Sequence, residues 1–129
     1  MKEDNNNIKI NKIQSLFWKI LFFSYVILII YLSIAQPVIN YSTYRGEDKI
    51  VHFVSYFIGA DLFFTAFYKK SNKFYFAINL IFFLVIPILT EYLQKFTYYR
   101  TYSVLDMLAN YIGALVGFLF FLFKYRAFN

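Results

Sequence analysis

Cysteine is absent from this 129-residue sequence, and histidine occurs once. Without cysteine the chain cannot form disulfides, thiolate metal sites or a cysteine nucleophile. The single histidine leaves no second imidazole with which to build a familiar catalytic spacing. Glycine and proline are scarce, with four and two residues, and neither a glycine-rich loop nor an internal repeat is present. Chemistry in this chain therefore depends on a small set of other polar residues.

Hydrophobic residues make up 60% of the chain and aromatic residues 25%, well above a soluble average. Eighteen Phe and thirteen Tyr exceed what a globular core of this size could cover, whereas a bilayer accepts Phe inside and Tyr at its boundaries. The net charge of +6 comes from basic residues in short clusters between apolar runs, which is typical of topology signals. The composition predicts a membrane protein with no nucleic-acid partner.

Four apolar stretches of roughly 20 residues are each long enough to cross a hydrocarbon core of about 30 Å as a helix. They cover residues 16–35, 50–68, 74–92 and 104–123. We therefore expect an all-α fold, an integral membrane four-helix bundle over residues 16–123, flanked by a flexible tail at 1–15 and a short tail at 124–129. A cleaved signal peptide is the alternative for the first stretch, but signal peptides have shorter apolar runs of about 7–15 residues.

Lys and Arg are unequally divided between the two sides of this bundle. Nine lie in the N-terminal tail and start of the first span, the turn at 69–73 and the C-terminal tail, against four near the loops at 36–49 and 95–102. Positive residues mark the cytoplasmic side. Both termini are therefore predicted to be cytoplasmic, and the other two loops to face outward.

Polar residues gather near the outward ends of the later spans. On the second span, Asp48, His52 and Tyr56 recur at i, i+4 and i+8, so they share one helix face. On the third span, Glu91 and Gln94 are neighbours at i and i+3. The second and third spans therefore each present a polar face at the same side of the membrane.

The fourth span carries a straight seam of polar and small residues at successive steps of 3, 4, 3 and 4. The seam consists of Ser103, Asp106, Asn110, Gly113 and Gly117. Ser103 and Asp106 fit a helix capping box, which stabilises a helix start by about 1 kcal/mol. Gly113 and Gly117 fit a small-residue packing notch. The seam is expected to meet other helices.

Charged groups cost roughly 2.5–3.5 kcal/mol each at the centre of an inserting helix, so they tend to face the bundle interior and find partners. Arg100 can bond with Glu91 or Asp106, and Asp48 can orient the His52 ring. We expect these residues to meet beneath the outer leaflet. The alternative is that His52 and Glu91 are solvated helix ends. A saturated cluster would close the bundle, whereas an unsaturated one would bind a ligand.

Asp61 and the outer tyrosines fall outside this cluster. Asp61 lies nine residues past His52, about 13 Å deeper, and is expected to be protonated or paired, with Asn79 as a candidate partner. A proton relay is the alternative role. The tyrosines are predicted to form an interfacial aromatic belt; they are Tyr41, Tyr44, Tyr98, Tyr99 and Tyr102.

The segments "DKIVHFVSY" at 48–56, "EYLQ" at 91–94, the arginine at 100 and "SVLDMLANYIGALVG" at 103–117 together resemble the VanZ-like family of small bacterial membrane proteins. The resemblance covers about residues 15–123. It implies a four-helix membrane protein whose name-giving member accompanies glycopeptide-resistance genes and reduces sensitivity to teicoplanin. The matching positions are Asp48, Lys49, His52, Glu91, Gln94, Arg100, Ser103, Asp106 and Asn110.

These observations lead to three hypotheses for a protein of the bacterial inner membrane. No cofactor is predicted, and a metal ion enters only as one form of the second hypothesis. The first is a non-enzymatic envelope protein whose outer polar pocket engages an amphiphile, either a lipid-linked wall precursor or a lipoglycopeptide. The second is an enzyme acting on a phosphorylated lipid, with His52 and Glu91 as acid and base, or His52, Glu91 and Asp106 as metal ligands. The third is a structural partner that docks another membrane protein on the Gly113 and Gly117 seam.

Overall fold

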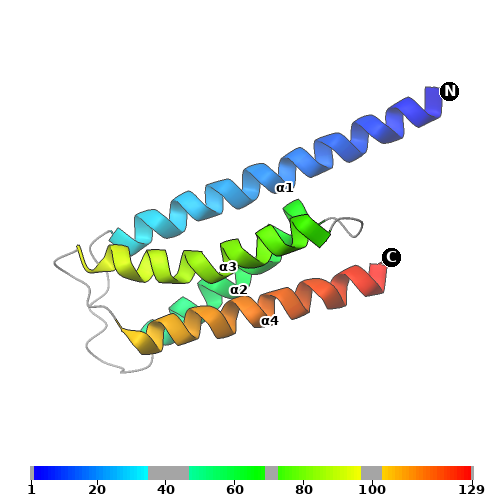
Figure 1. The fold of residues 1–129 in the computed structure, drawn as a ribbon. Helices are drawn as coiled ribbons and strands as arrows, with labels where there is room; N and C mark the ends of the chain where they lie inside the picture. Colours follow the sequence, from blue (N-terminus) through cyan, green and yellow to red (C-terminus); the bar gives the residue numbers. More distant parts are fainter. Residues whose placement is uncertain (1, 35–46, 69–72, 97–102, 129) are drawn as a thin grey trace.

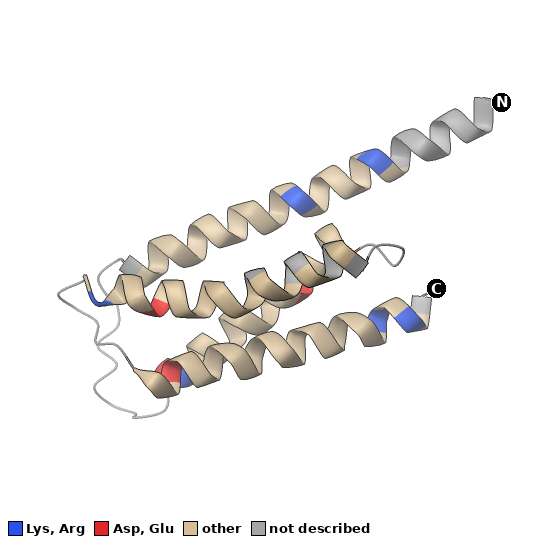
Figure 2. Cartoon of the chain, in the orientation of Figure 1, with Lys and Arg blue, Asp and Glu red and all other residues tan. Residues whose placement is uncertain are grey.

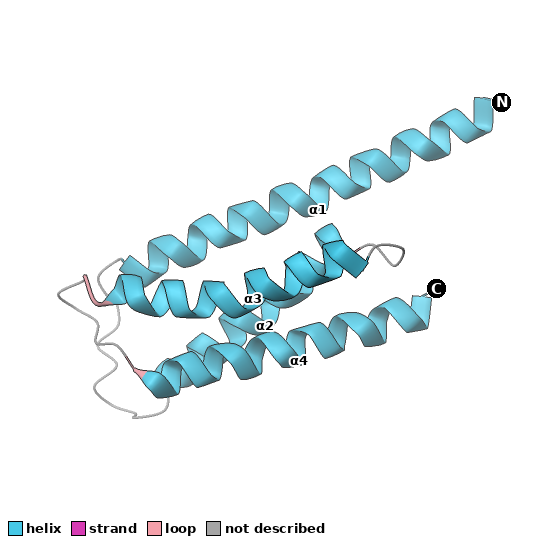
Figure 3. Ribbon diagram, viewed as in Figure 1, coloured by secondary structure: helices cyan, strands magenta, loops and turns pink. Residues whose placement is uncertain are grey.

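The computed structural model describes residues 2–34, 47–68, 73–96 and 103–128. These residues form four helices: α1 (Lys2–Ile34), α2 (Glu47–Phe67), α3 (Lys73–Gln94) and α4 (Val104–Phe128). All secondary structure in the described part of the chain is helical (Figure 3). The all-α fold with four helices is therefore confirmed.

Three of the helices are long and apolar enough to cross a membrane. The apolar segments are Asn11–Ser33 in α1, all of α2, and Val104–Ala127 in α4. In α3 the described apolar segment is the shorter Phe83–Gln94. Large hydrophobic side chains are exposed on all four helices, with Ile27 at 69%, Ile50 at 63%, Leu84 at 52% and Phe123 at 71%. Apolar surface on this scale is typical of a membrane protein.

The ends of the chain differ from the sequence-based expectation. Residues 1–15 were predicted to be a flexible tail, but α1 begins at Lys2; residues 124–129 were predicted to be a tail, but α4 continues to Phe128. The physical reason is that no Gly or Pro occurs between residues 1 and 34, and each residue added to an existing helix gains a hydrogen bond without a new nucleation cost. The polar residues at each end of the chain therefore show where the apolar segment stops, but the helix continues beyond that point.

The helices run in alternating directions, so the bundle has two distinct ends (Figure 1). At the polar end, α1 and α3 finish while α2 and α4 begin; at the terminal end, α1 and α3 begin while α2 and α4 finish. Both termini of the helical bundle therefore lie at the same end of the molecule. Figure 2 places the charged residues of α2, α3 and α4 near their helix ends, with uncharged lengths between.

The tightest contact in the bundle is between α2 and α4, along the seam predicted from sequence. A Cβ atom at Gly113 would overlap the carbonyl oxygen of Phe53, and one at Gly117 would overlap that of Phe57. Ala60 is completely buried beside them. The close approach predicted for the notch is confirmed, and α2 of the same chain fills it. The seam is therefore occupied within this chain, and the prediction that it docks another membrane protein stays untested.

An aromatic cluster holds the terminal end together. Phe22 of α1, Phe63 and Phe64 of α2, and Phe121 of α4 are buried against one another. Phe83 of α3 stacks on Phe64, with ring centroids 5.3 Å apart. Aromatic rings from all four helices therefore stabilise the half of the bundle that lies away from the polar residues.

Candidate polar site and adjoining cavity

The polar end of the bundle brings together most of the residues singled out in the sequence. The first turns of α2 carry Asp48 and His52, the last turn of α3 carries Glu91 and Gln94, and the first turns of α4 carry Asp106 and Asn110. The buried members are His52, Glu91, Gln94, Asp106 and Asn110, each no more than 8% exposed. The alternative that His52 and Glu91 are solvated helix ends is therefore wrong.

His52 lies at the centre of the α2–α4 part of the site. Its Nδ1 is 2.9 Å from the amide oxygen of Asn110, which accepts a hydrogen bond when Nδ1 carries the ring proton. In that tautomer the lone pair is on Nε2. This Nε2 lies 3.8 Å from Oδ1 of Asp48 and 4.0 Å from Oδ2 of Asp106.

The two oxygens of Asp106 have different neighbours. Oδ1 accepts a hydrogen bond from Nζ of Lys49 at 3.2 Å, while Oδ2 faces His52. The backbone N–H of Asp106 donates to Oγ of Ser103 at 3.3 Å, so Ser103 caps α4 as predicted. The carboxylate that would complete a capping box is instead turned toward α2.

Glu91 connects α3 with the start of α4. It is fully buried, and its Oε1 accepts the backbone N–H of Ser103 at 2.8 Å. Its Oε2 has no hydrogen-bond partner among the described residues. The predicted partner Arg100, like the five tyrosines of the predicted aromatic belt, lies outside the described residues, so those predictions stay untested.

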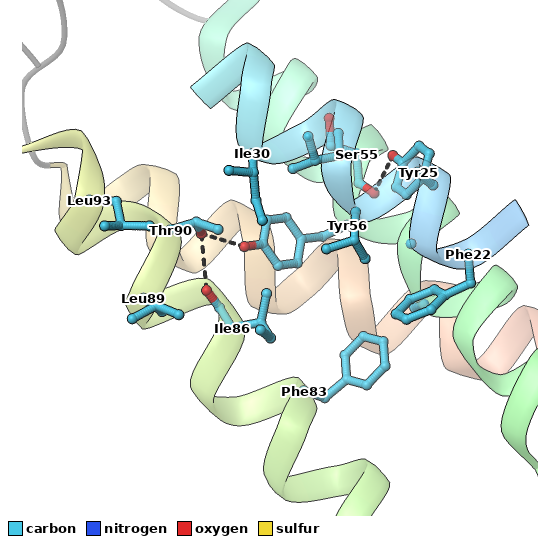
Figure 4. A pocket seen from close by; sticks show the side chains of 14 residues that line it. Phe22, Tyr25, Ile30, Ser55, Tyr56, Phe83, Ile86, Leu89, Thr90 and Leu93 are labelled. Atoms are coloured by element: carbon cyan, nitrogen blue, oxygen red, sulfur yellow. Dashed lines mark hydrogen bonds between the residues drawn. The ribbon is translucent and has the colours of Figure 1, made fainter. Parts of the chain in front are cut away.

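Tyr56 shares a helix face with His52 but points to a different helix. Its hydroxyl shares a hydrogen bond with Oγ1 of Thr90 on α3, and the Thr90 hydroxyl is 3.1 Å from the carbonyl oxygen of Ile86 (Figure 4). Sequence reasoning missed Thr90. The available signal was its spacing: Thr90 and Gln94 fall at i and i+4 on one face of α3.

A cavity adjoins the polar site between α1, α2 and α3 (Figure 4). This cavity measures about 90 Å³ and is lined by apolar side chains including Phe22, Phe83 and Ile86. A second, smaller cavity of about 60 Å³ reaches His52 and Gln94. Tyr56 and Thr90 line both cavities, so the apolar cavity and the one beside the polar site are neighbours that share these two side chains.

The cavity opens between α1 and α3. Its lining includes Ile30 of α1, which is 42% exposed, and Leu89 of α3, which is 48% exposed. These side chains belong to the apolar outer surface of the bundle. The exposed part of the cavity lining therefore faces the medium that the apolar helices contact.

Three side chains of the site could hold a metal ion. Ligand atoms of Asp48, His52 and Asp106 all lie within 4.8 Å of one another, and His52 and Asp106 are buried. This group shares His52 and Asp106 with the predicted ligand set of His52, Glu91 and Asp106, and has Asp48 where Glu91 was predicted. Asp48 takes this place because it lies one helical turn before His52 on the same face of α2.

Asp61 lies away from the polar site and has a partner that was not predicted. Both of its carboxylate oxygens are 2.7 Å from Nζ of Lys124. The expectation that Asp61 is paired is confirmed, with Lys124 of α4 as the observed partner; the side chain of Asn79, the predicted partner, lies outside the described residues. This ion pair joins α2 to α4 near the terminal end.

The fold and site define an all-helical protein with three helices able to cross a membrane and a buried polar cluster beside a laterally open cavity. No protein-family model, curated protein or solved structure matches this chain.

Proposed function

We propose that this chain is a VanZ-like integral membrane protein of the bacterial inner membrane that binds an amphiphile without transforming it. The bound molecule is a lipid-linked wall precursor or a lipoglycopeptide, and through it the protein affects teicoplanin susceptibility. The family and the phenotype rest on the sequence resemblance, namely the motifs around Asp48, Glu91 and Ser103.

One observation carries the binding proposal: an apolar cavity at the bundle surface lies next to a smaller cavity beside the buried polar cluster. An amphiphile has two matching parts, a polar group and a hydrocarbon chain joined to it. Its polar group fits beside His52 and Gln94, and its chain fits between Phe83, Ile86 and Leu89. Entry between α1 and α3 lets the chain stay in the apolar phase throughout, so it needs no aqueous path.

The orientation of the site follows from the positive residues. At the terminal end, α1 carries Lys12 and Lys19 and α4 carries Lys124 and Arg126. Because such residues concentrate on the cytoplasmic side, the terminal end is cytoplasmic and the polar end faces outward. The cluster then lies at the leaflet in which exported wall precursors and externally added lipoglycopeptides are present.

The test is to fill the cavity without touching the polar residues. Ile86→Trp adds bulk to the cavity wall, and Ile112→Trp, at a position 54% exposed on α4, is the matched control. Purified wild type should be labelled by a photoactivatable undecaprenyl phosphate. We expect Ile86→Trp to weaken this labelling about tenfold, equivalent to about 1.4 kcal/mol, with Ile112→Trp unchanged.

The same variants should be expressed in a teicoplanin-susceptible bacterium. Wild type and Ile112→Trp should raise the inhibitory concentration, and Ile86→Trp should not. Equal labelling and equal susceptibility for all three proteins, at equal expression, would end the binding proposal.

A membrane enzyme acting on a phosphorylated lipid is the second candidate. The observation that favours it is His52 Nε2, which is buried, lacks a hydrogen-bond partner among the described residues, and lies beside two carboxylates. The two candidates separate on turnover. Release of inorganic phosphate from the lipid by wild type, lost in His52→Gln, would replace the binding proposal by the enzymatic one.

A further inference from the structure

Three ligating side chains converge at the α2–α4 contact. Asp48 and His52 come from successive turns of α2, and Asp106 comes from the first turn of α4. The side chains of His52 and Asp106 are 9% and 5% exposed, while that of Asp48 is 43% exposed. The group is therefore enclosed by protein on the bundle side and accessible past Asp48.

The imidazole of His52 provides an independent reason to expect a cation here. Nε2 is buried and has no hydrogen-bond partner within the described part of the chain. Its distances of 3.8 and 4.0 Å to the carboxylate oxygens are too long for N–H···O hydrogen bonds, which measure about 2.7–3.2 Å. With Nδ1 donating to Asn110, the Nε2 lone pair faces two electron-rich oxygens, an arrangement that a cation between them would stabilise.

Lys49 does not supply that cation. Its Nζ contacts Oδ1 of Asp106 at 3.2 Å, which leaves Oδ2 of Asp106 directed at Nε2. The ammonium thus orients the carboxylate and neutralises one of the two acidic charges. Two carboxylates and one ammonium therefore surround Nε2, so acidic groups outnumber basic ones beside the imidazole.

We propose that Asp48, His52 and Asp106 bind a divalent transition-metal ion, with Zn²⁺ as the representative of the class. Imidazole and carboxylate ligands suit such ions, at about 2.0–2.2 Å from the metal. Tetrahedral ligands at that distance lie about 3.4 Å from one another, so the observed separations of 3.8 Å for Asp48, 4.0 Å for Asp106 and at most 4.8 Å within the group must shorten when the ion binds. Three protein ligands leave a coordination position for water, and Asn110 holds the ring tautomer as outer partners of ligating histidines do.

The chain offers an unambiguous spectroscopic test because it has one histidine and no cysteine. Full-length protein labelled with ¹⁵N-histidine in detergent micelles gives a single pair of imidazole nitrogen signals. On titration with ZnCl₂ we expect the Nε2 signal to shift until one equivalent is bound, while Nδ1 keeps the signature of a protonated nitrogen. Nitrogen signals that stay unchanged at saturating Zn²⁺ would overturn the proposal. This measurement uses no amphiphile, so its outcome is independent of the proposed function.

A pair of variants locates the site. Asp48→Asn removes a ligand whose half-exposed position makes it tolerant of substitution, and we expect it to weaken Zn²⁺ binding by at least about tenfold in a chelator competition assay. Glu47→Gln removes the same charge from the neighbouring, exposed residue and should leave the affinity unchanged. If the two variants weakened binding equally, Zn²⁺ would be held by surface charge and not by the proposed ligands. Displacement of Zn²⁺ by equimolar Mg²⁺, an ion that prefers oxygen ligands, would lead to the same conclusion.

Discussion

Glu91 shows how a single side chain can connect two helices at the polar end. Its Oε1 accepts the backbone N–H of Ser103 at 2.8 Å, one of the N–H groups at the start of α4 that have no acceptor within the helix. Glu91 is fully buried, whereas Ser103 is only partly buried. The contact therefore fixes where α4 starts relative to the end of α3.

Glu91→Gln and Glu91→Ala should differ in stability. Gln keeps a side-chain oxygen where Ser103 needs an acceptor, whereas Ala leaves the N–H unsatisfied, which costs about 1–3 kcal/mol. We expect thermal unfolding in micelles, followed by circular dichroism, to shift clearly for Glu91→Ala and little for Glu91→Gln. Equal losses for both would mean that the charge of Glu91, and not its bond to Ser103, stabilises the bundle.

Sequence reasoning at the residue scale predicted which polar residues meet but not how they pair. Spacing placed Asp48, His52, Glu91 and Asp106 at one end of adjacent spans, and the structure confirms that placement. Which side chains pair depends on how each helix is rotated about its axis. The spacing of residues shows which face of a helix is polar, but it does not define this rotation closely enough to assign individual contacts. Asn110, predicted as a member of the seam and of the polar cluster but not as the partner of His52, lies 2.9 Å from Nδ1 of that ring.

At the scale of the helices, the α2–α4 contact is determined by the two glycines of the seam. We expect Gly113→Ala to destabilise the protein by about 1–3 kcal/mol, as overpacked cores do, because its Cβ would meet the backbone oxygen of Phe53. Gly59→Ala is the matched control, since its Cβ would lie 3.3 Å from the side chain of Tyr25, which can move. Thermal unfolding of both variants tests this, and a Gly113→Ala protein as stable as Gly59→Ala would contradict the packing.

The partner of the seam could not be read from the sequence. A small-xxx-small pattern indicates that a helix approaches closely, and both an internal helix and another protein satisfy it equally. The pairing with α2 arises because Gly113 and Gly117 lie opposite Phe53 and Phe57, two residues that are also one turn apart. That match between two helices appears only when both are placed in space.

At the scale of the whole molecule, composition and the lengths of the apolar runs were sufficient to predict the class of fold. Four runs separated by polar segments predict four helices, because a backbone in hydrocarbon must satisfy its own hydrogen bonds. The cavity between α1, α2 and α3 was beyond such reasoning. It exists because α1 packs closely through Phe22 at the terminal end and leaves exposed side chains such as Ile30 toward the polar end.

The proposed orientation of the whole molecule can be tested with engineered cysteines, because the native chain has none. Glu47→Cys places an exposed thiol at the polar end, and Ala127→Cys places one at the terminal end. Since positive residues are retained on the cytoplasmic side, a membrane-impermeant maleimide applied to spheroplasts should label Glu47→Cys and leave Ala127→Cys unlabelled until the membrane is permeabilised. Labelling in the reverse order would put the polar site in the cytoplasm, where it would meet precursors before export and never a lipoglycopeptide added from outside.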